Sequence, residues 1–164
     1  MLIKRILLLG FIAIFSIQLQ ASSGPRAGQT APGFTLTDLK GKSHSLDGLL
    51  EKGPVMLVFW STKCHVCHAL IPKFKAIHND YASKGLTFVA INVGYEDHDD
   101  VDDYAFEYKL PYLVLNQDDK KMQLAQDYRL QGTPTIQVIK KDGTVIYRGH
   151  SIPNMDKLLA ETGK

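Results

Sequence analysis

The sequence predicts an α/β fold, in which helices cover both faces of a central sheet. Residues 54–60 form a continuous apolar run of strand length, which is typical of a strand buried on both faces. Between residues 64 and 83, apolar side chains recur every three or four positions, as they do along one face of an amphipathic helix. The residues of this stripe are Val66, Leu70, Phe74, Ile77 and Tyr81. A second strand-like run follows at residues 86–93. The three segments predict a strand, helix, strand unit with parallel strands.

The first residues of the chain have the pattern of a secretory signal peptide. Lys4 and Arg5 precede an apolar run at residues 6–17. This run is shorter than the roughly 20 residues with which a helix spans a bilayer. We therefore expect residues 1–23 to be a cleaved signal peptide, with an uncleaved N-terminal anchor as the alternative. Either outcome predicts export, to the periplasm or another extracytoplasmic location.

One folded domain is expected after the signal peptide. Residues 24–30 are expected to form a linker, and residues 31–164 have the length of a single domain. The whole chain is 45% hydrophobic and 22% charged, which excludes extensive disorder and multiple membrane spans. Lys and Arg number 19 against 17 Asp and Glu, a balance unlike that of nucleic-acid-binding proteins. Nucleic acid is therefore not an expected partner.

Turn signals divide the rest of the domain into short elements. Apolar residues on both sides of Lys40-Gly41-Lys42 predict an N-terminal β-hairpin, and Lys141-Asp142-Gly143 marks a second hairpin. Asn154 is expected to cap a final helix. The run at residues 96–103 has six acids in eight positions and is expected to be a solvated helix start. The remaining predicted elements are a helix at 99–108, a strand at 112–115, a helix at 119–128, strands at 135–140 and 144–148, and a helix at 155–162.

The chain contains two cysteines, Cys64 and Cys67, which lie where the buried strand is followed by the helix. A disulfide between them closes almost no loop and contributes little stability. Free N–H groups at a helix N-terminus stabilise an anion, so a cysteine there has a pKa of about 3.5 to 7.5 instead of about 8.5. We therefore expect Cys64 to be the attacking thiolate, flanked by Lys63 and His65, and Cys67 to be a more buried resolving thiol. Such a pair predicts dithiol–disulfide exchange.

Five motifs of the chain occur together in one protein family. They are Ala31-Pro32-Gly33-Phe34-Thr35-Leu36, Phe59-Trp60, Cys64-x-x-Cys67, Pro72 within the helix, and Gly132-Thr133-Pro134-Thr135 before a strand. In this combination the sequence resembles the thioredoxin-fold thiol:disulfide oxidoreductases, specifically their exported TlpA-like or ResA-like branch. The resemblance extends over residues 31–164 and implies a central mixed sheet flanked by helices. It also implies an N-terminal β-hairpin and a central helix-strand insertion at residues 99–115.

The same resemblance implies a site and an activity. Pro134 is expected to be a cis-proline facing the cysteines, and Thr133 to offer backbone groups to a substrate peptide. The implied activity is the reduction of disulfides in exported proteins, such as those of cytochrome c biogenesis, with no bound cofactor and no metal. The implied partners are exported protein thiols and disulfides and a membrane electron donor of the DsbD/CcdA type. The supporting residues expected around the cysteine pair are Trp60, Lys63, His65 and Val66.

Two acidic positions of the family are apolar in this chain. Thioredoxins commonly have an aspartate two residues before the tryptophan, and some ResA-like proteins have a glutamate three residues after the second cysteine. The residues at these positions are Val58 and Leu70. The proton acceptor for Cys67 is therefore open between His65, His68, water and a partner.

Alternative functions use the same residues. Cys64-His-Val-Cys-His68 is also the attachment pattern of a c-type haem, with His68 as an iron ligand. A copper-binding metallochaperone of thioredoxin-like fold would use the cysteines and histidines as ligands, with His150 approaching from elsewhere in the chain. A peroxidase of the peroxiredoxin group shares Ala31-Pro32, but it has a proline before its first cysteine that this chain lacks.

Overall fold

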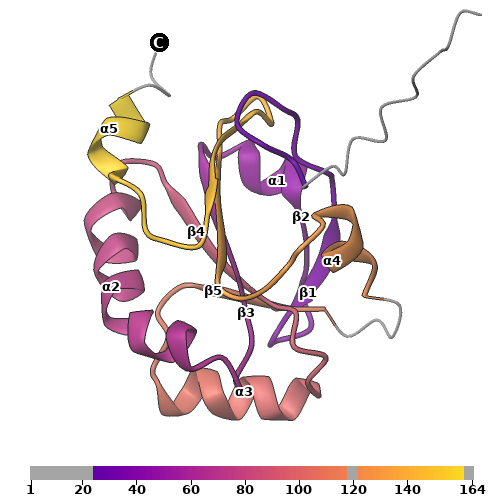
Figure 1. Cartoon of the computed structure of the whole chain (residues 1–164). Helices are drawn as coiled ribbons and strands as arrows, with labels where there is room; N and C mark the ends of the chain where they lie inside the picture. Colours follow the sequence, from indigo (N-terminus) through magenta and orange to yellow (C-terminus); the bar gives the residue numbers. More distant parts are fainter. Residues whose placement is uncertain (1–23, 118–121, 161–164) are drawn as a thin grey trace, which may run out of the picture.

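A mixed sheet forms the centre of the structure (Figure 1). The computed structural model describes residues 24–117 and 122–160, so the predicted signal peptide at 1–23 lies outside the described residues. Within those ranges the sheet has seven strands: β1 (Thr35–Asp38), β2 (Ser43–Ser45), β3 (Val55–Trp60), β4 (Thr87–Asn92), β5 (Leu113–Asn116), β6 (Thr135–Ile139) and β7 (Val145–Gly149). Their order is β2-β1-β5-β4-β3-β6-β7. β4 is parallel to both β3 and β5, and the other neighbours are antiparallel.

Helices cover both faces of this sheet (Figure 1). Those in the described part of the chain are α1 (Leu46–Leu50), α2 (His65–Ala82), α3 (His98–Glu107), α4 (Gln123–Asp127) and α5 (Met155–Ala160). Side chains of α2, α3 and α5 pack on one face, and those of α1 and α4 pack on the other. The predicted α/β architecture, the N-terminal hairpin of β1 and β2, and the inserted pair α3 and β5 are confirmed.

The central strand β3 belongs to both hydrophobic cores. All six of its residues are buried, and successive side chains of a strand point to opposite faces of the sheet. Val55, Leu57 and Phe59 therefore join the core under α1 and α4. The alternate residues Met56, Val58 and Trp60 join the core under α2, α3 and α5. This double burial explains why residues 54–60 are apolar without alternation.

The buried face of α2 differs by one residue from the predicted stripe. The predicted stripe began at Val66 and continued through Leu70, but Val66 is 58% exposed. The residues of α2 that are buried against the sheet are Cys67, Ile71, Phe74 and Ile77. A shift of one residue turns a helix by about 100°, so Val66 points to solvent while Cys67 points into the core. The predicted stripe is therefore wrong at Val66, whereas Leu70 packs half-buried against the core and Phe74 and Ile77 are buried as predicted.

The remaining elements match the predictions with different bounds, except for α1, which was not predicted. Asn154 caps α5 as expected, since its Oδ1 accepts the Lys157 N–H at 2.9 Å. The predicted helices at 119–128 and 155–162 each extend partly beyond the described residues. α1 has five residues, too few to show a helical period, although Ser45 Oγ accepts the Gly48 N–H at 3.1 Å as an N-cap.

The segment before the first strand is joined to the β6–β7 hairpin. The Gly28 N–H donates to the Val145 carbonyl at 2.8 Å, and the Ala31 N–H donates to the Gly143 carbonyl at 3.0 Å. Residues 24–30, which we expected to form a linker, thus lie along the folded domain for part of their length. In the described part of the chain, no helix combines the length and the apolar character that a membrane span requires.

Candidate active site

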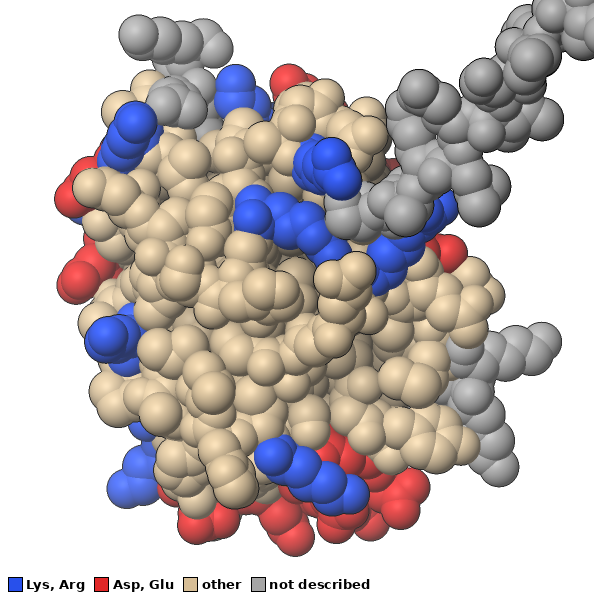
Figure 2. All heavy atoms as spheres, in the orientation of Figure 1, with Lys and Arg blue, Asp and Glu red and all other residues tan. Residues whose placement is uncertain are grey.

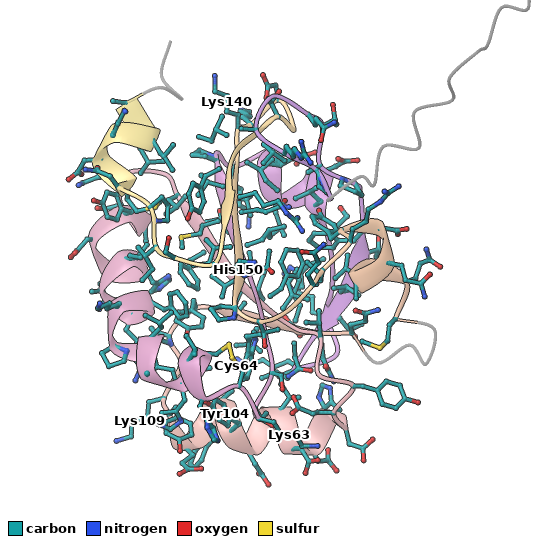
Figure 3. The ribbon with its side chains drawn as sticks, in the orientation of Figure 1. Lys63, Cys64, Tyr104, Lys109, Lys140 and His150 are labelled. Carbon is teal, nitrogen blue, oxygen red and sulfur yellow. A yellow bond between two sulfur atoms is a disulfide. The ribbon has the colours of Figure 1, made fainter. Side chains whose placement is uncertain are left out.

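The two cysteines form a disulfide at the N-terminus of α2. β3 ends at Trp60, a turn of three residues follows, and Cys64 is the N-cap of the helix. The Cys64–Cys67 Cα atoms are 5.2 Å apart, and the Cys67 N–H donates to Cys64 Sγ at 3.1 Å. Figure 3 shows Cys64 near one end of the molecule, on the same side as Lys63 and Tyr104, with Lys140 at the opposite end. The structure therefore shows the oxidised form of the pair.

The two sulfur-bearing residues differ in exposure. Cys67 is 3% exposed and belongs to the core beneath α2, whereas Cys64 is half-buried at the edge of that core. The neighbouring side chains Lys63, His65 and Val66 are exposed. A thiol or disulfide of another protein can therefore approach Cys64 more readily than the buried Cys67. α2 also has no acidic residue in its first turn, so its dipole favours a thiolate at this position.

The loop that precedes β6 lies at the same end of the sheet. β3 pairs antiparallel with β6, and Phe59 is opposite Thr135, which places the two preceding residues beside the end of β3. The peptide bond between Thr133 and Pro134 is cis, as the family resemblance implied. Pro134 is buried, and its carbonyl accepts a hydrogen bond from His150 Nδ1 at 2.7 Å. Thr133 is half-buried at the surface of this loop.

His150 therefore has a structural role that its place in the sequence did not predict. Its Nδ1 carries the proton that is donated to the Pro134 carbonyl. In the metallochaperone alternative, His150 would instead be a metal ligand. Among the residues that the structure describes, no three His, Cys, Asp or Glu side chains converge as a metal site would require.

An aromatic cluster lies against the buried side of the cysteine pair. The Trp60 and Tyr104 ring centroids are 5.0 Å apart, and those of Tyr104 and Tyr108 are 4.4 Å apart. His68 extends the cluster to the surface, since its ring centroid is 4.6 Å from that of Tyr108. Trp60 is 5% exposed, so it is a core residue beneath the site and does not form part of its surface. Burial raises the pKa of Tyr104. The tyrosines of α3 were not predicted, because no sequence signal connects them with the cysteines.

The geometry of His68 also bears on the haem alternative. Its Nδ1 lies 3.4 Å from the Tyr104 hydroxyl, and its ring packs edge-on against Tyr108. The motif begins a helix that follows a central strand, and both faces of that strand are filled by side chains. The motif therefore lies beside a sheet whose two faces are both packed with side chains.

Glu96 is the largest difference between prediction and structure near the site. We expected it to begin a solvated acidic helix, but it is 6% exposed and α3 begins two residues later. Its carboxylate accepts four hydrogen bonds, from Ser61 Oγ at 3.1 Å, the Thr62 N–H at 3.0 Å, Thr62 Oγ1 at 2.5 Å and Asn92 Nδ2 at 2.5 Å. Burial alone would raise the pKa of Glu96. The hydrogen bonds together lower it by more than burial raises it, so the pKa lies below its usual value. An ionised carboxylate therefore lies under the turn that leads to Cys64.

The rest of the acidic run is exposed, as expected, and it gives one edge of the molecule a negative surface. Figure 2 shows Asp and Glu side chains gathered along the lower edge, where Figure 1 places α3. The exposed acids on this helix are Asp99, Asp100, Asp102, Asp103 and Glu107. Because Figure 3 places Lys63 at the same edge, this surface adjoins the turn that carries Cys64.

Comparison with known proteins agrees with this geometry. Residues 27–148 match the AhpC/TSA family. A thiol-disulfide oxidoreductase ResA from Geobacillus kaustophilus is 36% identical over 118 residues, which are 72% of this chain and 66% of that protein. The match thus spans slightly less than two thirds of this relative.

Solved structures share the same fold. The thioredoxin domain of a thiol-disulfide oxidoreductase from Bacteroides vulgatus has a TM-score of 0.70 at 24% identity, covering 84% of this chain and 95% of that one. A structure from Chlorobium tepidum, described as a thiol:disulfide interchange protein DsbE, has a TM-score of 0.70 at 25% identity. It covers 84% of this chain and 94% of that one. The thioredoxin-like architecture implied by the sequence motifs is therefore confirmed.

Proposed function

The chain belongs to the AhpC/TSA family of thioredoxin-like proteins, and from this premise we propose that it is an exported thiol:disulfide oxidoreductase that reduces disulfides in other proteins. One observation carries the proposal. Cys64 and Cys67 form a disulfide at the N-terminus of α2, with the first residue half-buried at the surface and the second in the core. This arrangement suits an exchange in which one sulfur meets the substrate and the other completes the reaction. The similarity to a ResA oxidoreductase supports the same activity.

The reaction begins with the reduced pair. The Cys64 thiolate attacks one sulfur of the substrate disulfide, a mixed disulfide forms, and the other substrate sulfur leaves as a thiolate. Cys67 then loses its proton and attacks Cys64 Sγ, which releases the second substrate sulfur. Two electrons have passed to the substrate, which takes up two protons as its thiolates become thiols. The product form of the protein is the disulfide seen in the structure.

Neighbouring residues are proposed to support these steps. The free N–H groups at the start of α2 stabilise the Cys64 thiolate, and the positive charge of Lys63 adds to this effect. Thr133, beside the cis-proline Pro134, is proposed to pair its backbone with an extended substrate segment. Val66 is 58% exposed and offers an apolar contact to the substrate next to the sulfur. His65 is exposed on the same turn and is proposed to contribute a second cation when protonated.

Turnover requires a second partner that reduces the disulfide again by supplying two electrons. We propose a membrane electron donor of the DsbD/CcdA type for this step. Substrates in cytochrome c biogenesis are consistent with the DsbE description of a structural neighbour. Reduction outside the cytoplasm also requires export, for which we propose that residues 1–23 are a signal peptide, cleaved or retained as an anchor.

The proposed function is tested by trapping the mixed disulfide. Cys67→Ser should hold substrate proteins covalently on Cys64, whereas Cys64→Ser should trap none and should lose all exchange. Both variants are expressed with the leader in a bacterial host, and adducts are resolved by non-reducing electrophoresis and mass spectrometry. Trapping by Cys64→Ser in place of Cys67→Ser would reverse the assigned roles. If neither variant forms adducts and the purified wild type reduces no protein disulfide, the proposed function is wrong.

A further inference from the structure

A buried carboxylate connects the ends of the two central parallel strands. Trp60 at the end of β3 pairs with Asn92 at the end of β4, and each strand then continues into a turn. Glu96 lies four residues beyond β4 and accepts hydrogen bonds from Ser61 and Thr62 on the other turn. These contacts span 34 and 35 residues of sequence. We name this arrangement the Glu96 clamp and define it by Ser61, Thr62, Asn92 and Glu96.

The clamp extends to the reactive cysteine through Ser61. The Ser61 hydroxyl, which donates to Glu96, also accepts the Lys63 N–H at 3.1 Å. The Ser61 carbonyl accepts the Cys64 N–H at 3.1 Å. The Thr62 N–H bonds to the Glu96 carboxylate directly, and the Lys63 and Cys64 N–H groups bond to Ser61, which itself bonds to Glu96. These contacts link Glu96 to the turn that leads to Cys64.

Gly94 shows how closely the two turns approach. A Cβ atom at this position would lie 2.6 Å from Glu96 Oε2 and 2.7 Å from Ser61 Cβ. Both distances are too short for a side chain to be accommodated without moving the clamp. The Gly94 N–H also donates to Asn92 Oδ1 at 3.1 Å, so the β4 turn is held at both ends.

We propose that Glu96 is a positioning residue for the exchange reaction, which orders the turn before Cys64 and opposes its thiolate with a negative charge. The inference rests on the proposed function of the cysteine pair. The family commonly has an acidic residue near the cysteines at the position of Val58 or Leu70, but both are apolar in this chain. Glu96 supplies a buried carboxylate near the cysteine segment from a different position. Since a thiolate near a buried anion is destabilised, the clamp makes the dithiol a stronger reductant than the helix terminus alone would.

In the part of the chain that the structure describes, no Lys, Arg or His nitrogen lies within ion-pair distance of the Glu96 carboxylate. Four hydrogen-bond donors stabilise its ionised form, and its pKa is below the usual value although burial acts in the opposite direction. It is therefore ionised at neutral pH. The tests below leave the other titratable groups around the turn unchanged. They are Lys63, His65 and His68 on the cysteine segment, Tyr104 on α3, Tyr108 at its C-cap, and His150 after β7.

The test separates the charge from the hydrogen bonds. Glu96→Gln keeps the shape of the side chain and removes the charge. We expect the pKa of Cys64 in the reduced protein to fall by about 0.5 unit or more, which is about a threefold rise in the ratio of thiolate to thiol. The thiol–disulfide exchange equilibrium between the cysteine pair and glutathione should shift toward the protein dithiol by a similar factor. The pKa is measured by thiolate absorbance, and the equilibrium by alkylation and intact mass, on the mature wild-type and variant chains.

Asp38→Asn is the matched control. Asp38 is also a carboxylate with a lowered pKa, and it accepts hydrogen bonds from the Lys40 and Lys42 N–H groups, both at 2.9 Å. It is the last residue of β1, and its carboxylate also pairs with His44 on β2 at 2.8 Å. This substitution should leave the Cys64 pKa and the glutathione equilibrium at their wild-type values. An equal shift in both variants would show a general charge effect and would overturn the proposal.

A second variant tests the positioning effect without changing the charge. Thr62→Val removes the Thr62 hydroxyl and leaves the carboxylate in place. We expect its exchange rate with a model protein disulfide to fall at least threefold while the Cys64 pKa stays near the wild-type value. An unchanged rate would contradict the positioning role even if Glu96→Gln failed to fold. Glu96→Gln with a wild-type pKa and glutathione equilibrium would contradict the charge effect.

These outcomes are distinguishable from failure of the proposed function. The Cys64 pKa can be measured whether or not the wild type reduces a protein disulfide. A shifted pKa in Glu96→Gln together with an inactive wild type would retain the charge effect and reject the function. An active wild type with unshifted variants would retain the function and reject the clamp.

Discussion

The two faces of the sheet are built from one strand but serve different purposes. On the face under α1 and α4, β3 contributes aliphatic and aromatic side chains to a closed core that includes Tyr128. On the face under α2, α3 and α5, the same strand contributes Trp60 to a core that reaches the surface through Cys67 and Cys64. The cysteine pair belongs to the second face, so we expect the first face to contribute to stability alone and the second also to determine how the disulfide is presented. Substitutions on the two faces should separate these roles.

The largest expected effect is on the closed face. Leu57→Ala should lower the free energy of unfolding by about 3 kcal/mol, because a fully buried leucine is removed and leaves a cavity. The glutathione equilibrium of the folded protein should not change. Urea denaturation and the alkylation assay measure the two quantities. A tenfold shift of the equilibrium in this variant would show that the faces are not separable.

A smaller effect on stability is expected on the face that carries the disulfide. Tyr104→Leu removes ring contacts with Trp60 and Tyr108 and should lower the free energy of unfolding by about 1.5 kcal/mol. It should also speed alkylation of Cys67 in the reduced protein, because Tyr104 helps to enclose that residue. Tyr81→Leu, at the other end of α2, is the control and should leave the alkylation rate unchanged. Equal rates in Tyr104→Leu and the wild type would contradict this account.

A single hydrogen bond on the closed face gives a finer test. The Tyr128 hydroxyl donates to the Pro32 carbonyl at 2.7 Å. Tyr128→Phe removes this bond and keeps the ring, which lies 4.9 Å from that of Phe59. The free energy of unfolding should fall by about 1 kcal/mol, with no change in exchange rate. A slower exchange reaction without loss of stability would argue against a purely structural role for this face.

The smallest expected effect is a dependence of stability on pH at the open end of the second face. The pKa of Glu96 is lower in the folded protein than its ordinary value of 4.5, so the ionised carboxylate stabilises the fold at neutral pH. This contribution is lost as the pH falls below 4.5 and through the folded pKa. The difference in unfolding free energy between the wild type and Glu96→Gln should therefore shrink between pH 6 and pH 3. A difference that grows on acidification would show the opposite sign of the shift.

Local patterns were sufficient for most of the fold. The apolar run of β3 and the glycine-containing turns predict the strands and their hairpins, because each signal lies within a few residues of the element it specifies. α1 is too short to show a period. The apolar stripe of α2 was wrongly started at Val66 because the first turns of this helix mix polar and reactive residues with apolar ones, so the period is not clear there.

The candidate site was predictable only where a motif is contiguous. Cys64 and Cys67 are three positions apart, and the cis bond at Pro134 follows from a motif of four residues. Glu96 and His150 act on residues 34 and 16 positions away, through contacts that exist only once the sheet has formed. Glu96 in particular belongs to an acidic run whose composition indicates solvent exposure. Its burial depends on donors from the neighbouring turn, and no linear pattern contains that information.

The cysteine pair and the β6–β7 turn lie at opposite ends of the molecule (Figure 3), which has a practical consequence for its use as a reagent. The β6–β7 turn at Lys140, where Lys141 and Asp142 are exposed, lies at the end of the molecule opposite Cys64 (Figure 3). A fluorophore or a solid support attached at Lys141 would leave the cysteine end free. Immobilised Cys67→Ser protein, oriented in this way, would present its remaining sulfur outward as bait for capturing the proteins it acts on.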